Sequence, residues 1–219
     1  KKDSTMKKLL ILLFSILISF NSYGKTVCVE ENSVQERGGT YYLVNQQEPF
    51  TGDNLCAYTN SGQYHSKGKI KKGKKDGKWI WWHENGQVFA EQNYKDDELD
   101  GKVTNWYENG QKKWERNYKD GKEDGKWTDW YKNGQKWSEG NFKDGNRDGM
   151  RTWWHENGQK KVETYFKDGK EDGKWTSWNE NNQINSEANY QDGKLVSETQ
   201  YTYHENNQIR TEENYKDGK

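Results

Sequence analysis

Three His-Glu dipeptides are the residues of this chain that could most directly bind a metal ion. They begin at His83, His155 and His204. A protein metal site needs three or four ligands that converge on one point, whereas these histidines lie in different copies of a sequence repeat. Two of the other copies carry Tyr107 or Tyr131 at the equivalent position. We therefore expect strand-end histidines with a packing role, and the sequence predicts neither a metal site nor a cofactor.

Aspartates four residues apart could supply oxygen ligands for calcium. The pairs are Asp120 and Asp124, Asp144 and Asp148, and Asp168 and Asp172. Their spacing matches neither the EF-hand loop nor the nonapeptide repeat of calcium-binding β-helices. Turn formation explains aspartates beside glycines better.

No catalytic constellation can be placed on the sequence. It offers no Ser/His/Asp elbow, Cys/His pair, phosphate-binding loop or paired-carboxylate cleft. The glutamates that could act as acids recur in every repeat, which is unlike a single catalytic acid. We predict that the chain is not an enzyme.

One aromatic residue and one glutamate recur in each repeat and could together form a binding ladder. The aromatic members are Trp82, Trp106, Trp130, Trp154, Trp178 and Tyr203, and the acidic members are Glu91, Glu115, Glu139, Glu163, Glu187 and Glu212. The alternative interpretation is structural, with packed tryptophans and glutamates that accept hydrogen bonds. We favour it because an element present in every unit usually holds the units together. The twelve residues are still the candidate binding face.

The elements that position these residues form a repeat of about 24 residues. Asn-Gly-Gln or Asn-Asn-Gln begins at Asn85, Asn109, Asn133, Asn157, Asn181 and Asn206. Asn-Gly favours the type I′ turn of a two-residue β-hairpin, and Asp-Gly pairs such as Asp124-Gly125 are expected in the links between hairpins. Six good units follow a degenerate one at about residues 50–73. The sequence predicts an all-β fold, with tandem β-hairpins forming an elongated, twisted antiparallel sheet or an open solenoid.

The predicted turn also fixes which side chains share a face, because faces alternate along a strand. The series that begin at Trp82 and Glu91 are expected on one face. The opposite face is expected to carry Trp79, Trp127 and Trp175. Since both faces carry aromatics, either one is covered by neighbouring hairpins or one is an exposed binding surface.

Composition excludes several classes of protein. Lys+Arg and Asp+Glu both number 35, and the resulting zero net charge removes the electrostatic basis for binding nucleic acid or a polybasic membrane contact. Residues 1–24 hold eight of the sixteen Leu and Ile residues, so the rest of the chain has no ordinary aliphatic core. It holds 29 of the 32 Trp, Tyr and Phe residues instead, which favours an ordered chain when these recur in register.

Residues 1–24 are predicted to be a secretory signal peptide, with residues 1–5 preceding its Met6. A basic start is followed by an apolar stretch from Leu9 to Phe20, which is too short for a comfortable transmembrane span. Cleavage after residue 24 would place the protein in the periplasm, on the cell surface or in the medium, without a transmembrane span. An uncleaved anchor is the alternative.

The mature chain would then consist of an N-terminal segment, residues 25–49, and a repeat array, residues 50–219. Cys28 and Cys56 are the only cysteines. In an exported protein the default expectation is one disulfide, which would tie the N-terminal segment to the first repeat. Two free thiols are the alternative.

One unit resembles a known repeat closely. Residues 125–135, followed by Phe142–Gly145 and Asp148-Gly149, resemble the bacterial MORN-repeat variant found in YwqK-type antitoxins. Pro49–Gly52 is similar to the lead-in of that family to its first unit, and the resemblance covers about residues 47–219. It implies a hairpin-repeat fold and an immunity or antitoxin role, exercised by binding a toxin. The predicted signal peptide departs from a cytoplasmic antitoxin.

The leading hypothesis is therefore an exported, non-enzymatic repeat scaffold that binds another protein, either a toxin or a surface protein. Trp and Tyr suit interface anchors. A cell-wall or glycan-binding module is the alternative, because tryptophan faces stack on sugars and quaternary ammonium groups. A self-assembling structural protein is the third, since open sheet ends can pair with other copies.

Overall fold

The computed structural model describes residues 25–216, so the predicted signal peptide lies outside the described residues. All regular structure in this range is β-strand. The strands form hairpins with a period of about 24 residues in a large, mostly antiparallel sheet that does not close, which confirms the predicted fold class. No helix in residues 25–216 is long and apolar enough to cross a membrane.

The N-terminal segment contributes β1 (Lys25–Val27), β2 (Val34–Arg37) and β3 (Thr40–Leu43). The repeat array contributes β4 (Gly52–Ala57), β5 (Tyr64–Lys71), β6 (Lys74–Trp82), β7 (Val88–Lys95), β8 (Glu98–Leu99), β9 (Gly101–Trp106), β10 (Lys112–Lys119), β11 (Lys122–Trp130), β12 (Lys136–Lys143), β13 (Asn146–Arg147), β14 (Gly149–Trp154), β15 (Lys160–Lys167), β16 (Lys170–Trp178), β17 (Ile184–Gln191), β18 (Lys194–Tyr203) and β19 (Ile209–Lys216).

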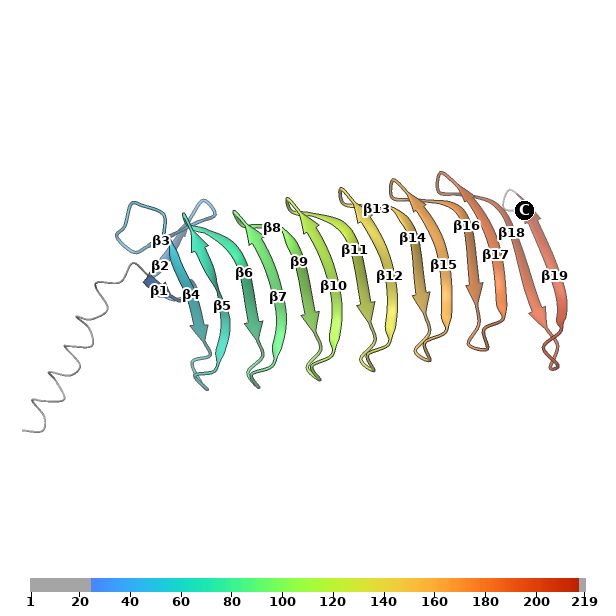
Figure 1. Cartoon of the computed structure of the whole chain (residues 1–219), viewed down its shortest axis with the longest axis horizontal. Coiled ribbons are helices and arrows are strands. Elements are labelled where there is room, and N and C mark those ends of the chain that lie inside the picture. The colour runs from blue at the N-terminus through green and yellow to red at the C-terminus, as the bar shows by residue number, and fades with distance from the viewer. Residues whose placement is uncertain (1–24, 217–219) are drawn as a thin grey trace, which may run out of the picture.

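The long strands pair antiparallel in chain order from β4 to β19, so the array is one continuous meander. Figure 1 shows the hairpins side by side along the long axis of an elongated molecule. At the N-terminal edge β1 pairs in parallel with β4, while β2 and β3 form a separate two-stranded sheet. The 24-residue period therefore corresponds to two strands of the sheet.

The Asn-Gly end of each hairpin differs from the predicted type I′ turn. In the first unit the His83 N–H donates to the Gln87 carbonyl at 2.8 Å, and the Gly86 N–H donates to the His83 carbonyl at 2.9 Å. This makes a three-residue loop in which Gly86 (φ 82°) but not Asn85 has positive φ. Phe89 is then an extra residue, since Trp82 pairs with Val88 and Trp81 with Ala90. This bulge restores the predicted register, so the predicted faces hold.

The type I′ geometry occurs at the opposite end of the strands. Lys119 pairs with Lys122 across Asp120 (φ 46°) and Gly121 (φ 76°). The second Asp-Gly pair of the unit, Asp124-Gly125, lies within β11 and not in a link as predicted. It forms part of a bulge that faces β10, and a side chain on β10, Asn117, donates its amide N–H to the Lys126 carbonyl at 2.8 Å. Both ends of the strands are therefore tight turns, and the links are hairpins themselves.

We call the face with Trp79, Trp127 and Arg151 the packed face, because most buried side chains point from it. Its residues lie opposite one another in rows across the sheet: Trp127 pairs with Arg116 on one side and with Gly140 on the other. Gly140 has no side chain, and the Trp127 ring lies over it: a Cβ added there would be 2.6 Å from the indole nitrogen.

The N-terminal segment covers the first part of the packed face. Val27, Phe50, Ile70 and Trp79 form a buried cluster, against which Val34, Tyr41 and Leu43 also pack. A short cross-link holds this cover in place, because Cys28 and Cys56 form a disulfide with Cα atoms 4.7 Å apart. The buried Asn54 side chain also accepts a hydrogen bond from the Val29 N–H at 3.0 Å.

Candidate binding surfaces

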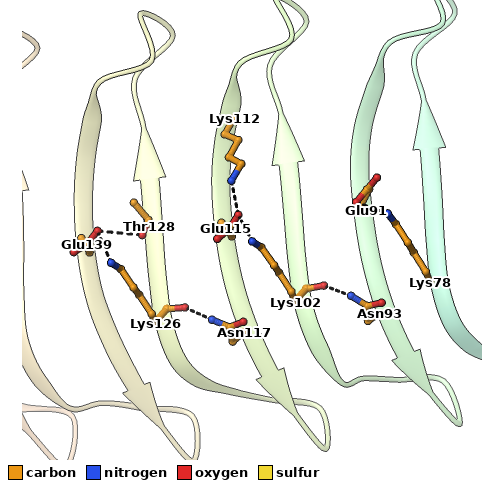
Figure 2. A network of polar contacts seen from close by, with 10 residues as sticks. All are labelled: Lys78, Glu91, Asn93, Lys102, Lys112, Glu115, Asn117, Lys126, Thr128 and Glu139. Carbon is orange, nitrogen blue, oxygen red and sulfur yellow. Dashed lines mark hydrogen bonds and ion pairs between the residues drawn. The ribbon is translucent and has the colours of Figure 1, made fainter.

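The recurring glutamates lie on the face opposite the packed face, and all of them except Glu212 pair with a lysine. Figure 2 shows Glu115 between Lys102 on β9 and Lys112 on its own strand, with N–O distances of 2.8 and 2.6 Å. The same arrangement recurs around Glu139, from Lys126 and Lys136. Glu91, Glu163 and Glu187 each pair with one lysine. We call this the ion-pair face. For Glu212 no ion pair is found within residues 25–216.

The lysines keep these glutamates ionised. Partial burial alone would raise the pKa of Glu115, but hydrogen bonds and charge from Lys102 and Lys112 outweigh burial and lower the pKa below its ordinary value. The pKa of Glu139 is lowered in the same way by Lys136 and Lys126. The five paired glutamates of this face are therefore already neutralised by lysines of the chain itself.

The recurring tryptophans share the ion-pair face, as predicted, and are half-buried. The Lys112, Lys136 and Lys160 ammonium groups lie 5.4–5.7 Å from the ring centroids of the tryptophans in the following unit: Trp130, Trp154 and Trp178. These lysines also pair with Glu115, Glu139 and Glu163, so in the central repeats each lysine links the glutamate of its own unit to the tryptophan of the next. Thr104, Thr128, Thr152 and Thr176 are buried between them.

Trp82, Trp106 and Tyr203 extend this aromatic series to the ends of the array. A hollow of about 330 Å³ lies beside Trp106, lined also by Lys78, Glu91, Lys102 and Glu115. It is the place on the ion-pair face where a small polar ligand could contact both an indole ring and charged groups.

A second ladder runs along the Asn-Gly loops. The Tyr107 hydroxyl donates to the Trp130 carbonyl and the Tyr131 hydroxyl to the Trp154 carbonyl, both at 2.8 Å. The His155 Nε2 lies 3.0 Å from the next carbonyl of the series. The histidine thus takes the structural place of a tyrosine, as its position in the repeat predicts.

Metal-ligating side chains do not converge around the predicted histidines. Within residues 25–216 the one group with suitable spacing is Cys28, Cys56 and His65. The two sulfur atoms of that group form the disulfide, so they are not thiolate ligands.

The packed face of the central repeats carries a stack that the sequence analysis missed. The Arg116 guanidinium lies 4.9 Å from the Trp114 ring centroid and 5.5 Å from that of Trp127. The Arg151 guanidinium lies 4.3 Å from the Trp127 centroid and 4.1 Å from that of Trp153. Three tryptophans and two arginines therefore alternate across β10, β11 and β14. We call these five residues the Trp–Arg stack.

Acidic neighbours compensate only one end of this stack. Arg116 pairs with Glu123 at 3.1 Å and with the buried Asp129 at 3.7 Å. Arg151 is 8% exposed. Burial and the nearby Arg147 lower the pKa of Arg151 to about 10, although Asp129 opposes this shift. The cationic form of Arg151 therefore lacks the stabilisation that a close carboxylate would give.

A protein-family model matches the chain in segments that agree with the repeat geometry. The family model for the MORN repeat variant matches six segments of the chain, which together cover more than half of it: residues 75–96, 99–120, 123–144, 147–168, 171–192 and 199–217. The chain belongs to the MORN repeat variant family. No curated protein matches it.

The first five MORN repeat variant segments each begin near one two-residue turn and end at the next, so the family unit spans one complete hairpin with its three-residue loop. MORN repeats are commonly protein- or membrane-binding modules. The glutamate of the ion-pair face recurs in all six units, whereas Arg116 and Arg151 belong to individual units. An alignment of the units by their packed-face residues would have indicated the Trp–Arg stack, because three of the five arginines of the chain lie on that face.

Proposed function

We propose that this MORN repeat protein is an exported, non-enzymatic scaffold that binds another protein through its packed face. The observation that carries the proposal is the unequal cover of that face. At its N-terminal end the chain's own Val34, Tyr41 and Leu43 pack onto it. Across β10–β16 no described segment packs over the same face.

The side chains that point from this uncovered part suit a protein interface. Trp114 and Trp153 are half-buried, and Arg147, over the Phe166 ring, is exposed on the same face. Trp and Arg are the side chains most often found where binding energy concentrates in interfaces. The ion-pair face is less suited to a protein interface, because its lysines and glutamates are paired with one another and surface ion pairs contribute little free energy.

Site-specific photocrosslinking in intact native cells tests this assignment. A benzoylphenylalanine placed at Trp153 samples the packed face, and one placed at Tyr165, which is 51% exposed on the ion-pair face, is the matched control. The proposal predicts a discrete protein adduct from position 153 and not from position 165. Absence of an adduct at 153, or equal adducts at both positions, would refute it.

An immunity or antitoxin protein is the specific form of this proposal, supported by the resemblance of the repeat units. It predicts that the chain rescues the growth of cells that express the product of a neighbouring gene. Lack of rescue for every neighbour would refute the specific form and leave protein binding intact. Mass spectrometry of the mature N-terminus tests export, with cleavage after Gly24 as the expected result.

A glycan-binding module is the second candidate, and the hollow beside Trp106 favours it. Stacking of a sugar on this indole would leave Lys102 and Glu115 as hydroxyl partners. Sedimentation of the purified protein with peptidoglycan, lost on Trp106→Ala and retained on Trp153→Ala, is the result expected of this alternative.

A further inference from the structure

Polar atoms without hydrogen-bond partners concentrate on the uncovered part of the packed face. Residues 25–216 contain six buried side-chain nitrogen or oxygen atoms of this kind, and five of them lie there: Asn105 Oδ1, Arg116 Nε, Trp127 Nε1, Arg151 Nε and Thr164 Oγ1. Buried polar groups are nearly always hydrogen-bonded in folded proteins. Three of the five atoms are N–H donors, so the face lacks acceptors more than donors.

Unpaired positive charge on the same surface also indicates that an acceptor group is missing. Arg147 and Arg151 form no ion pair with any residue in the range 25–216, although Arg147 lies 5.4 Å from the Phe166 ring centroid. Two acids of the stack region, Glu123 and Asp129, both pair with Arg116. The centre of the packed face therefore presents two cations that form no ion pair with a carboxylate of the described chain.

The geometry holds one of these cations ready for an external partner. The Arg151 guanidinium lies over two rings, 4.3 Å from the Trp127 centroid and 4.1 Å from the Trp153 centroid. The nitrogens of a guanidinium held in this way form the fork that matches a carboxylate in two parallel hydrogen bonds. A side chain already immobilised by stacking loses little further freedom on binding.

The covered end of the face shows what kind of chain it accepts. There the strands β2 and β3 lie over Trp79 and its neighbours and supply Val34, Tyr41 and Leu43. The same face continues into the Trp–Arg stack without a change of strand order. An extended segment with alternating apolar side chains is therefore the cover already established at one end.

From these observations we infer that the packed face over β10–β15 binds an extended segment of a partner protein, and that Arg151 anchors it by binding an Asp or Glu side chain. The inference rests on the proposed protein-binding function and adds the chemistry of the partner. The apolar neighbours of that acidic residue lie over Trp114 and Trp153, and the carboxylate supplies the acceptor that the face lacks.

A phage-displayed library of random 12-residue peptides, selected on the full chain, is the probe. The expected outcome is enrichment of Asp or Glu at one position between apolar residues. For the best peptide, replacing that acid by its amide should weaken binding to the native chain about tenfold or more, the range for a hydrogen-bonded charged group. Arg151→Met should abolish this discrimination, Arg151→Lys should retain part of it, and Arg210→Met, on the exposed strand β19, should leave it unchanged.

The possible failures are distinguishable. Peptides that need Trp153 but show no preference for acids would overturn the carboxylate inference and leave the proposed function standing. Peptides whose binding ignores Trp153→Ala, or the absence of any selected peptide, would count against both. If Arg151→Met does not fold, Arg151→Lys and the amide peptide measured on the native chain decide the question alone.

Discussion

Gly68 on β5 provides a sharp test of how the packed face is built. A methyl group added at this position would lie 2.2–2.5 Å from three ring atoms of Trp79. Favourable carbon–carbon contacts need about 3.5–4.0 Å, so either the ring or the strand must move by more than about 1 Å. The backbone at Gly68 has ordinary φ, so the effect of Gly68→Ala comes from this contact and not from backbone strain.

Trp79 has little room to move. It is 1% exposed, and its indole N–H donates to the Lys69 carbonyl at 3.1 Å. Its ring also stacks on that of Trp81, with the two ring centroids 5.7 Å apart. Overpacking of this kind costs about 1–3 kcal/mol. The gain from replacing a strand glycine by alanine is about 0.5–1 kcal/mol. The net expectation is a loss of about 1–2 kcal/mol, or a lower urea midpoint by about 0.5–1 M for an m-value near 2 kcal/mol/M.

Urea unfolding followed by tryptophan fluorescence measures this loss, and a second substitution isolates its cause. One repeat further on, Val103 occupies the position of Trp79. In a Trp79→Val background Gly68→Ala should therefore be neutral or stabilising, which gives a favourable coupling of about 1–3 kcal/mol. If Gly68→Ala does not destabilise the native background, or if the two changes simply add, the close approach of Trp79 to Gly68 is wrong.

Three other predictions concern the hydrogen bonds along the Asn-Gly loops, the disulfide of the N-terminal segment and the ion pairs of Glu115. Tyr107→Phe should cost about 0.5–1.5 kcal/mol in chemical unfolding, because it removes the hydrogen bond to the Trp130 carbonyl, whereas Tyr165→Phe should be neutral. Replacing both cysteines by serine should lower stability by about 3–4 kcal/mol, given their separation of 28 residues, and should abolish any effect of reductant on thermal unfolding. The lowered pKa of Glu115 means that its ion pairs stabilise the fold above the ordinary value of 4.5 and are lost as pH falls through the folded-state pKa. Glu115→Gln should flatten the acid limb of a stability–pH curve, and an unchanged limb would show that these ion pairs do not contribute.

The fold could be predicted because its signals are local and repeated. Asn-Gly and Asp-Gly pairs mark reversals of the chain, and the 24-residue spacing fixes how many strands separate them. However, the type I′ turn was predicted at the Asn-Gly end of the strands, and the structure has it at the opposite end. Asn85 and Gly86 alone cannot distinguish a two-residue loop from a three-residue loop, and the compensating bulge at Phe89 leaves the later register the same. The predicted faces therefore held although the predicted turn was wrong.

The candidate site could be predicted only where it repeats. Glu115 and Trp130 were found because each has an equivalent in every unit. The structure pairs Glu115 with Lys102 of the same hairpin and places Trp130 beside Lys112 of the preceding unit. Arg116 and Arg151 have no such equivalents. Their stack depends on whether each tryptophan ring of the packed face lies over the preceding or the following strand. Trp127 lies over Gly140 on the following strand, whereas Trp79 lies over Gly68 on the preceding one. That choice depends on the sizes of neighbouring side chains across the sheet, which a single unit does not contain.

This difference between repeated and individual positions separates stability from recognition in the array. A residue that recurs in every unit can only present the same surface about every 24 residues, and here such residues are already engaged within the array: Glu115 pairs with Lys102 of its own hairpin, and the Trp130 carbonyl accepts a hydrogen bond from Tyr107 of the preceding unit. Specific recognition needs a surface that occurs once. The packed face of the central repeats meets that condition, since Gly140 leaves room for Trp127 to approach Arg151, and no other unit has this combination of residues. The shared positions therefore build the sheet, and the proposed partner specificity would reside in the positions that differ between units.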